Sequence, residues 1–437
     1  MIIVKNIVSV LSRDVFLYFV NIITGILVAR KLGPDLLGLW FIISLIPLYA
    51  ESFFRTKADV ASVYFFGKEK YSKYEILSSL NYIAFASSVV FIILIFLFFD
   101  YLYSFLCNNC NDNYSNEFKN ILLIVPISFL SLNYSYFHIS QNNVKIFNYK
   151  SVIYSISYGA LTVFLLYSFN MSLWALIIGS IVAHLLSLIY GVYNVRNKLK
   201  FFKPNWNLKI SLLKYGFNFY VNGIISFFQN EGVKNISLIF LSTSGIAFLG
   251  QGKNISDLMF KINNAIETIL YPTLSKIKNN KQAIQNVLKS FRFSFYFMLI
   301  IGVCLFFLAE SLIVLLYGKE FIDSALVVKI LVPSIIILGS STIFNSYYYS
   351  KGRADIVPKI SLVPSIFQLI LGYFLTKKFG LIGAAISISI GFFLQSILMI
   401  IVFIKDNNLK FNILLPKKED FLDFNQFIKY NLKKNEK

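Results

Sequence analysis

Seven of the ionisable side chains inside long apolar segments of this sequence fall in three groups. They are Arg13, Asp14, Glu231, Lys234, Lys253, Asp257 and Lys261. Glu231 and Lys234 are three residues apart, and Asp257 and Lys261 follow Lys253 by four and eight residues. These separations place the members of each group on one face of a helix. A charged group at the centre of a bilayer is costly, so such groups normally face a wet cavity. The spacing therefore predicts a polar stripe inside an apolar helical protein.

The charge of this stripe indicates what it would bind. Lys234, Lys253 and Lys261 outnumber Glu231 and Asp257, and the net positive charge suits a pyrophosphate. Lys offers a flexible point charge rather than a rigid fork. We interpret the cations as substrate-binding residues and the acids as counter-ions or ligands of a coupling ion, H⁺ or Na⁺. The alternative is that these groups form structural ion pairs that lock neighbouring helices together.

Arg13 is the phosphate-clamp candidate of the first apolar segment, although its side chain could instead extend to the membrane surface. Its neighbour Asp14 points about 100° away on a helix, so the two need not pair with each other. His184 is expected to be a hydrogen-bonded packing residue rather than a titrating one. His138 and Glu51 are expected at the membrane interface.

No pattern of a cofactor, catalytic or metal site accompanies these residues. The sequence lacks a phosphate-cradling ATPase loop and an in-register nucleophile–base arrangement. A lone Cys107-x-x-Cys110 cannot complete a four-ligand zinc site, and an optional disulfide or chance is favoured over a redox role. We therefore predict a transporter rather than an enzyme, without catalytic residues, metal or cofactor.

The elements that position these residues are apolar segments long enough to cross a membrane. Hydrophobic residues make up 57% of the chain and charged residues 14%, which excludes an ordinary soluble domain. A span needs roughly 20 apolar residues. We predict an all-α integral membrane protein whose twelve spans cover approximately residues 7–30, 36–56, 78–104, 119–140, 150–168, 172–195, 214–241, 245–271, 290–317, 324–350, 357–377 and 380–404.

The distribution of cations predicts the orientation. Of 41 Lys and Arg residues, 30 fall in alternate gaps between the predicted spans or at the span ends beside them, and six fall in or beside the other gaps. Cationic loops stay cytoplasmic during insertion, so both termini are predicted to be cytoplasmic. A net charge of +20 would ordinarily suggest nucleic-acid binding. Cations scattered between spans are better explained by anionic membrane lipids, so no nucleic-acid partner is predicted.

A weak internal duplication, offset by about 210 residues, relates the two halves of the chain. Pro126 in ILLIVPISFL corresponds to Pro333 in KILVPSIIIL, and a short basic link follows each segment. Each half starts in the cytoplasm, so the repeat is parallel, with the substrate path between the halves. The predicted organisation is a six-helix lobe over 1–200, a connector over 201–213, a six-helix lobe over 214–405 and a basic cytoplasmic tail over 406–437.

Several short segments resemble the Wzx-type polysaccharide-export flippases, relatives of the lipid II flippase and the multidrug and toxin extruders. They are ARKLGPDLLGLW from Ala29, ILYPTLSKIK from Ile269, LYGKEFIDSALVVKILVP from Leu316 and KFGLIGAAISISIG from Lys378. The resemblance covers residues 1–405 in order and spacing. It implies two lobes around a central cavity.

The resemblance also implies a function. The family uses alternating access to move an undecaprenyl-diphosphate-linked oligosaccharide, such as an O-antigen or capsule repeat unit, outward across the bacterial cytoplasmic (inner) membrane. Its implied partners are this lipid-linked substrate, membrane lipids and the glycan polymerase machinery. A multidrug extruder of the same fold is an alternative, and a polytopic glycan polymerase or glycosyltransferase is a further one. The short outward loops argue against the enzyme, and the positive stripe argues against a site for cationic drugs.

Overall fold

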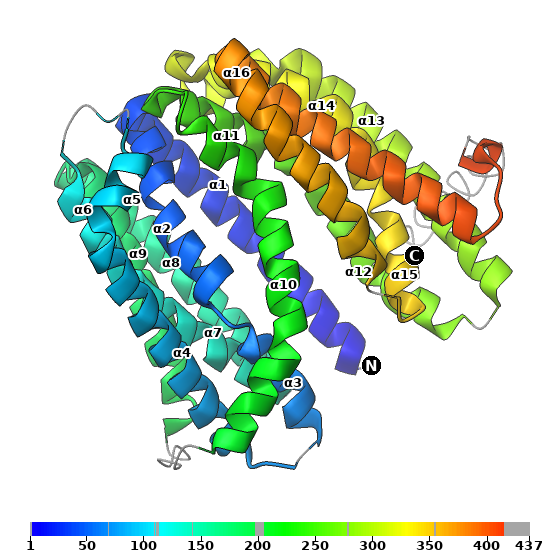
Figure 1. Ribbon diagram of the computed structural model, residues 1–437, viewed down its shortest axis with the longest axis horizontal. Coiled ribbons are helices and arrows are strands. Elements are labelled where there is room, and N and C mark those ends of the chain that lie inside the picture. The colour runs from blue at the N-terminus through cyan, green and yellow to red at the C-terminus, as the bar shows by residue number, and fades with distance from the viewer. Residues whose placement is uncertain are drawn as a thin grey trace, which may run out of the picture. The chain divides into compact units, whose positions relative to one another are not determined.

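A computed structural model describes residues 2–68, 70–108, 110, 113–141, 143–196, 205–277, 279–353 and 355–414. These residues fold into helices and turns, with no strand in the described ranges (Figure 1). The chain forms two compact units. The first contains residues 1–250 and 313–322, and the second contains residues 251–312 and 323 onward.

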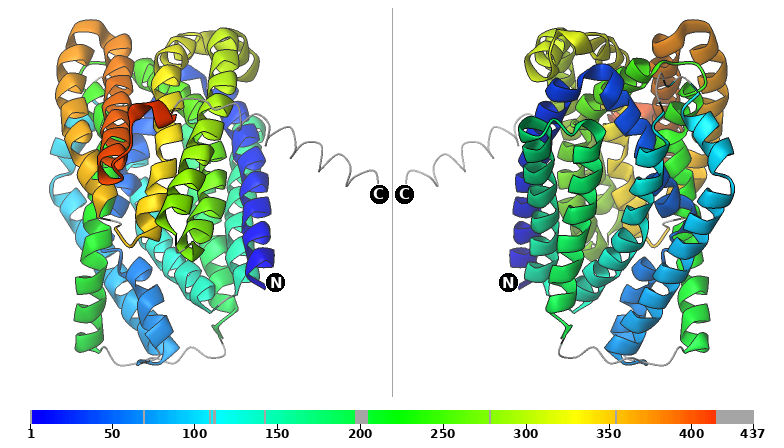
Figure 2. Two further views of the ribbon diagram at one scale, coloured as in Figure 1. Left: turned by 90° about the vertical axis from the view of Figure 1, so that its right-hand side faces the viewer. Right: turned by 90° about the vertical axis from the view of Figure 1, so that its left-hand side faces the viewer.

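The first unit is a bundle of long helices joined by short ones. Its elements are α1 (Ile2–Ile43), α2 (Leu45–Tyr49), the π-helix η1 (Ala50–Phe54), α3 (Ala58–Lys68), α4 (Lys73–Leu97), α5 (Phe99–Leu106), α6 (Ser115–Asn120), η2 (Ile121–Leu123), α7 (Ile124–Ser140), α8 (Val144–Ser168), α9 (Ser172–Tyr193), α10 (Trp206–Ser237), the first half of α11 (Thr243–Asp257) and η4 (Lys319–Phe321). Helix α8 packs between α1 and α9, and α10 packs against α3. Figure 2 shows the dark blue α1 running beside the teal helices α8 and α9.

Local sequence signals fix several helix ends in this unit. The hydroxyl of Ser72 accepts a hydrogen bond from the amide of Glu75 (3.1 Å), which is the N-terminal cap of α4. The side chain of Asn205 caps α10 in the same way through the amide of Leu208 (3.1 Å). These caps satisfy backbone donors that have no partner within the helix.

Two long helices are each interrupted at a glycine. Gly33 has φ 70° and ψ 176° inside α1, and Gly380 has φ 56° and ψ −131° inside α16. Residues with a Cβ avoid this backbone region. Predicted spans one and two meet near Gly33, and predicted spans eleven and twelve meet at Gly380. The glycines therefore provide the breaks that the predicted spans require.

The second unit contains α12 (Phe260–Lys276), most of α13 (Asn280–Tyr317), α14 (Asp323–Ser341), α15 (Ile343–Ser350), α16 (Ile356–Asp406) and η5 (Phe411–Leu414). Helix α14 packs along α16, and α12 packs on α15. An aromatic stack holds one end of this unit together. The ring of Phe344 lies 4.9 Å from that of Phe291 and 4.3 Å from that of Phe403.

Many large apolar side chains lie on the outside, as expected for helices that face lipid. Leu97 is 70% exposed and Phe307 76% exposed. In the described ranges, eight helical stretches are long and apolar enough to cross a membrane. Two of them, Ser12–Phe54 and Ile356–Asp406, contain the breaks at Gly33 and Gly380. Helices α10, α11 and α12 are not among the eight. The count of twelve spans and the parallel repeat remain predictions.

The two compact units divide the chain at a different place from the predicted lobes. Helix α10, which begins the predicted second lobe, groups with the first unit because it packs on α3, η1 and α4. The lobe limits remain a prediction. Residues 197–200 of the predicted first lobe, residues 201–204 of the predicted connector and the tail from residue 415 lie outside the described residues.

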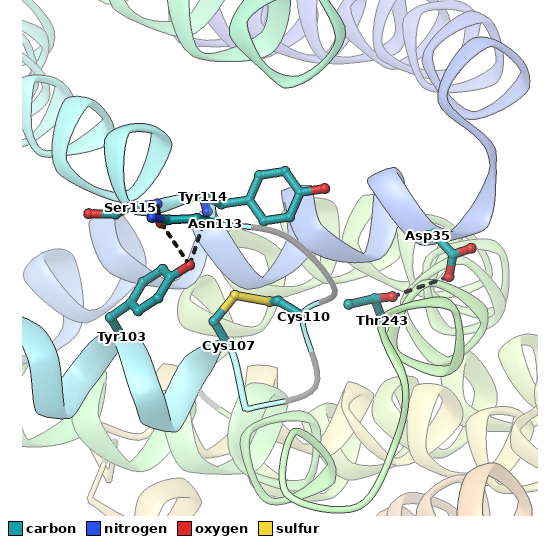
Figure 3. Close-up of a disulfide and its surroundings, with 8 residues drawn as sticks. All are labelled: Asp35, Tyr103, Cys107, Cys110, Asn113, Tyr114, Ser115 and Thr243. Carbon is teal, nitrogen blue, oxygen red and sulfur yellow. Dashed lines mark hydrogen bonds between the residues drawn. A yellow bond between two sulfur atoms is a disulfide. The ribbon is translucent and has the colours of Figure 1, made fainter.

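A disulfide closes the loop that follows α5. Cys107 and Cys110 are bonded, with their Cα atoms 5.0 Å apart (Figure 3). Beside them, the amide of Tyr114 donates to the hydroxyl of Tyr103 (3.0 Å). The sequence left chance and an optional disulfide open at these cysteines, and the structure contains the disulfide.

Candidate functional site

The predicted clamp Arg13 lies on α1 and joins α1 to α8. Its guanidinium donates to the Asp14 carboxylate (2.7 Å) and to the side-chain oxygen of Asn148 (3.0 Å). It also lies over the ring of Phe147, 4.7 Å from the centroid. The expectation that Arg13 and Asp14 need not pair was too cautious, because a long Arg side chain bridges the 100° separation.

The second predicted group forms a pair within α10. The ammonium of Lys234 lies 3.2 Å from the carboxylate of Glu231 and 5.4 Å from the ring centroid of Phe41. The hydroxyl of Tyr49 donates to the side chain of Asn235, which lies one turn after Glu231 on the same helix. This stretch of α10 thus contacts α1 and α2 within the first unit.

The third predicted group lies across a helix break. The ammonium of Lys253 donates to Asp257 Oδ2 (2.6 Å) within α11. Helix α11 ends at Asp257, and α12 begins at Phe260. Leu258 and Met259 form a tighter turn between the two helices, so Lys261 belongs to the next helix, and the shared face of residues 253, 257 and 261 stays a prediction. Asp257 Oδ1 is buried and has no hydrogen-bond partner among the protein atoms described.

The ion pairs do not match the predicted alternative of interhelical locks. The pairs Glu231–Lys234 and Lys253–Asp257 each lie within one helix. On an exposed helix surface such a pair contributes about 0.3–0.5 kcal/mol. That is far below the cost of removing two charges from water, so pairing alone gives a weak reason to keep them in an apolar segment.

A cavity with charged and hydroxyl lining lies elsewhere in the first unit, among α1, α2, η1, α7, α8 and α9. Its volume is about 490 Å³. The ionisable lining residues are Glu51, Lys150 and His184. Hydroxyl groups dominate the rest, from Ser44, Ser128, Ser131, Ser135, Ser151, Ser155, Ser187 and Tyr154. A ring of hydroxyls around a few charges is the kind of surface that hydrogen-bonds a polar ligand.

Lys150 is the most deeply placed charge of this cavity. Its side chain is 1% exposed. The ammonium donates to the carbonyl oxygen of Ser131 (2.5 Å) and approaches its hydroxyl (3.2 Å). No carboxylate pairs with it among the residues described. Neutral oxygens compensate a buried charge only in part, so Lys150 leaves positive charge available to a ligand.

Glu51 carries the negative charge at the other side of the lining. Its carboxylate accepts from Arg55 (2.7 Å) and lies 3.5 Å from the ammonium of Lys57. Arg55 also pairs with the buried Asp59. Burial and the adjacent Arg55 guanidinium lower the pKa of Lys57, and Glu51 opposes this shift. Glu51 is thus neutralised by neighbouring cations.

Sequence reasoning did not assign these residues to a site. Lys150, the first residue of a predicted span, is buried within α8. Glu51, which was expected at the membrane interface, lines the cavity. His138, with the same expectation, is 0% exposed, and its Nε2 lies 3.1 Å from the Gly191 carbonyl oxygen. The depth of both residues in the membrane stays a prediction. One signal was available, since Lys150 and Tyr154, and likewise Ser151 and Ser155, fall four residues apart and so share helix faces.

His184 partly matches its expected packing role. Its ring centroid lies 4.6 Å from that of Tyr154, and both side chains line the cavity. The histidine is therefore packed on one side and open to a polar space on the other.

Known proteins of two kinds resemble this chain. A candidate O-antigen transporter of Shigella flexneri is 25% identical over 85% of this chain and 90% of its own. The lipid II flippase MurJ in an inward closed conformation aligns with a TM-score of 0.75 at 18% identity, over 93% of this chain and 90% of its own. An inward-facing multidrug resistance MATE family transporter of the MOP superfamily aligns with a TM-score of 0.71 at 12% identity, over 88% and 93%.

The two structural matches confirm the fold predicted from the sequence, that of the lipid II flippase and the multidrug and toxin extruders. A family model described as "Polysaccharide biosynthesis protein" matches residues 27–326, which is more than half of the chain. This chain therefore belongs to the family of polysaccharide biosynthesis proteins.

Proposed function

We propose that this protein is a flippase that moves a lipid-linked oligosaccharide across the bacterial cytoplasmic membrane. The carrier would be undecaprenyl diphosphate, and transport would run outward by alternating access. The observation that carries this proposal is a polar cavity of about 490 Å³ inside an otherwise apolar helical bundle. Family membership and the flippase-like fold support it.

The polar cavity suits the carbohydrate part of the substrate. Sugars present several hydroxyls that both donate and accept hydrogen bonds, and the serine-rich lining offers matching groups. Tyr154 and His184 add ring surface against which a sugar ring can pack. The lipid tail stays in the bilayer while the glycan crosses through the polar space.

The charged residues suit the diphosphate. Arg13, Lys234, Lys253 and Lys261 present positive charge, and Asp14, Glu231 and Asp257 are their counter-ions in the absence of substrate. A dianionic headgroup cannot enter a path of low dielectric without compensating charge. Release requires weak binding, which favours separated cations over a tight cage of arginines.

Asp257 is also the proposed site of the coupling ion, with Glu231 as the second candidate. One carboxylate oxygen of Asp257 accepts from Lys253, and the other is buried without a protein partner. Asp257 lies at the C-terminal end of α11, and the ends of broken helices coordinate Na⁺ or H⁺ in several transporters. Either ion would therefore meet negative charge here.

A drug extruder of the same fold is the second candidate, because an extruder shares this fold. Its usual cationic substrates would need available carboxylates. In the cavity described here, Glu51 is occupied by Arg55 and Lys57, whereas Lys150 has no acidic partner among the described residues. This balance of charge favours an anionic substrate. A polymerase or glycosyltransferase is disfavoured because the family likeness is to transporters.

Translocation by the purified full-length protein tests the proposal. The protein is reconstituted in vesicles with an undecaprenyl-diphosphate-linked oligosaccharide, and glycan exposure is followed with membrane-impermeant periodate. Lys253→Ala and Lys261→Ala should each slow translocation by about tenfold, the effect of losing one charge-assisted contact. In cells the same variants should accumulate lipid-linked precursor inside.

Lys281→Ala is the matched control, because Lys281 is an exposed lysine of the same unit. It should translocate at the wild-type rate. Wild-type protein that moves cationic dyes but no lipid-linked glycan would support the extruder instead. Normal glycan transport by both alanine variants would refute the diphosphate assignment while leaving the flippase assignment intact.

A further inference from the structure

A second pocket of the first unit lies where the start of α10 meets α4 and the end of η1. Its volume is about 360 Å³. It is lined by Phe53, Phe54, Thr56, Tyr82, Ile83, Ala86, Ser87, Val90, Trp206, Lys209, Ile210 and Leu213. These side chains are almost all apolar or aromatic. Lys209 is the single charged residue among the described lining residues.

The ammonium of Lys209 is buried and lacks an anionic partner. The residue is 2% exposed, and its Nζ has no hydrogen-bond partner among the protein atoms described. It lies 3.1 Å from the ring centroid of Tyr82 and 4.5 Å from that of Trp206. Cation–π contacts offset only part of the cost of taking an ammonium out of water. The site therefore retains an uncompensated positive charge.

The groups that cover this charge can move aside. Tyr82 is 47% exposed and Trp206 is 62% exposed, so rotation of either side chain opens the ammonium to a ligand. The nearby carboxylate of Glu75 does not neutralise it, because Glu75 accepts from Asn205 (2.8 Å) and is not a lining residue. An incoming anion would thus find both a cation and an apolar slot.

The position of the pocket on the chain indicates which anion is available. Trp206 and Lys209 lie within the predicted basic connector, residues 201–213, on the side that the cation distribution predicts to be cytoplasmic. Basic pockets between membrane helices on this side bind the headgroups of anionic lipids. The apolar lining beyond Lys209 continues along α4 through Ile83 and Val90, which suits an acyl chain.

We propose that this pocket binds an anionic phospholipid of the cytoplasmic leaflet. The phosphodiester contacts the ammonium of Lys209, and one acyl chain lies along Ile83, Ala86 and Val90. A single cation matches the single charge of a phosphodiester better than the charge of a diphosphate. The bound lipid would fasten α10 to α4, independently of the substrate that the transporter moves.

Native mass spectrometry of the full-length protein in detergent tests this assignment. Phosphatidylglycerol is added to the wild type, to Lys209→Met and to Lys214→Met, an exposed lysine on the same helix. We expect Lys209→Met to weaken binding by about fivefold, close to the contribution of one lysine near an anionic lipid. Lys214→Met should bind as the wild type does.

Three further binding measurements distinguish an anionic phospholipid from other ligands. Ala86→Trp fills the slot and retains Lys209, so it should also weaken phosphatidylglycerol binding. Zwitterionic phosphatidylcholine, whose choline group offsets the charge of its phosphodiester, should bind the wild type more weakly than phosphatidylglycerol does. Undecaprenyl monophosphate should not displace phosphatidylglycerol at equal concentration. Unchanged binding to Lys209→Met, or displacement by the polyprenyl phosphate, would overturn the phospholipid assignment. Thermal unfolding of each variant in detergent identifies any that fails to fold.

Discussion

Several single side chains place a positive charge in the interior of this protein. Arg13, Lys150 and Lys209 use three different means to tolerate burial: a carboxylate with an amide, neutral oxygens, and aromatic rings. Only the first of these is a salt bridge. An ammonium that contacts only neutral groups can bind an anionic ligand without first breaking an ion pair. Lys150 and Lys209 are therefore more informative residues for mutation than Arg13.

Lys150→Met should separate stability from transport. Met has a similar length and removes a buried charge, whose desolvation costs several kcal/mol. We therefore expect an unfolding temperature in detergent equal to or above that of the wild type. Glycan translocation should fall by about tenfold, because the cavity loses its charge-assisted donor.

Lys145→Met is the control for this prediction, since Lys145 is an exposed lysine on the same helix. Its transport and stability should match those of the wild type. A clear drop in the unfolding temperature of Lys150→Met would instead make Lys150 a structural residue of α8.

The sequence identified the charged residues in apolar segments, but only those partners that lie within the same helix. Periodicity along one helix locates Glu231–Lys234 and Lys253–Asp257, because each pair is local. The contact from Arg13 to Asn148 joins α1 to α8, and residues so distant in the chain leave no spacing pattern. Lys150 escaped for another reason, since a lysine at the edge of an apolar segment looks like a loop cation.

At the level of helices, breaks matter as much as lengths. The apolar segments predicted where the helices run. The backbone angles at Gly33 and Gly380 show in addition that α1 and α16 each consist of two helices that meet at a break. The break between α11 and α12 was not predicted, because no glycine or proline marks residues 257–260. Breaks without such residues depend on tertiary packing, which the sequence pattern does not reveal.

Gly33→Ala should destabilise the turn between the two parts of α1. The φ of 70° with ψ of 176° lies in a region that is essentially restricted to glycine, so a Cβ adds about 1–3 kcal/mol of strain. We expect a lower unfolding temperature in detergent and less protein in the membrane. Gly25→Ala on the same helix is the control. A Cβ there meets no atom within 4 Å, so stability should be unchanged or slightly higher. Equal stability of the two variants would contradict this explanation of the break.

For the molecule as a whole, the fold class was predictable because the bilayer restricts the choice. A spanning chain must satisfy its backbone internally, and the alternation of basic gaps then orders the helices. The division into compact units was not predictable in this way. It depends on which side chains α10 packs against, and its contacts with α3 link residues more than a hundred positions apart.

The predicted orientation can be tested by labelling single cysteines from outside the cell. In a background with Cys107, Cys110 and Cys304 replaced by Ser, a membrane-impermeant maleimide should label Ser172→Cys and Ser244→Cys. It should not label Asn279→Cys, which the cation distribution places inside. Labelling at residue 279 in intact cells would overturn the orientation. Permeabilised cells, in which all three positions should react, provide the control for accessibility.

The bond between Cys107 and Cys110 has a consequence for where this protein matures. Thiols in the cytosol are kept reduced, whereas bonds of this kind persist in compartments that supply an oxidant. If the loop after α5 emerges on the outer side, the disulfide can form only after that loop has crossed the membrane. Chains whose loop has not yet crossed would carry two thiols that can be alkylated, Cys107 and Cys110, and mature chains would not. The loss of alkylation at these two cysteines would therefore report the progress of membrane insertion.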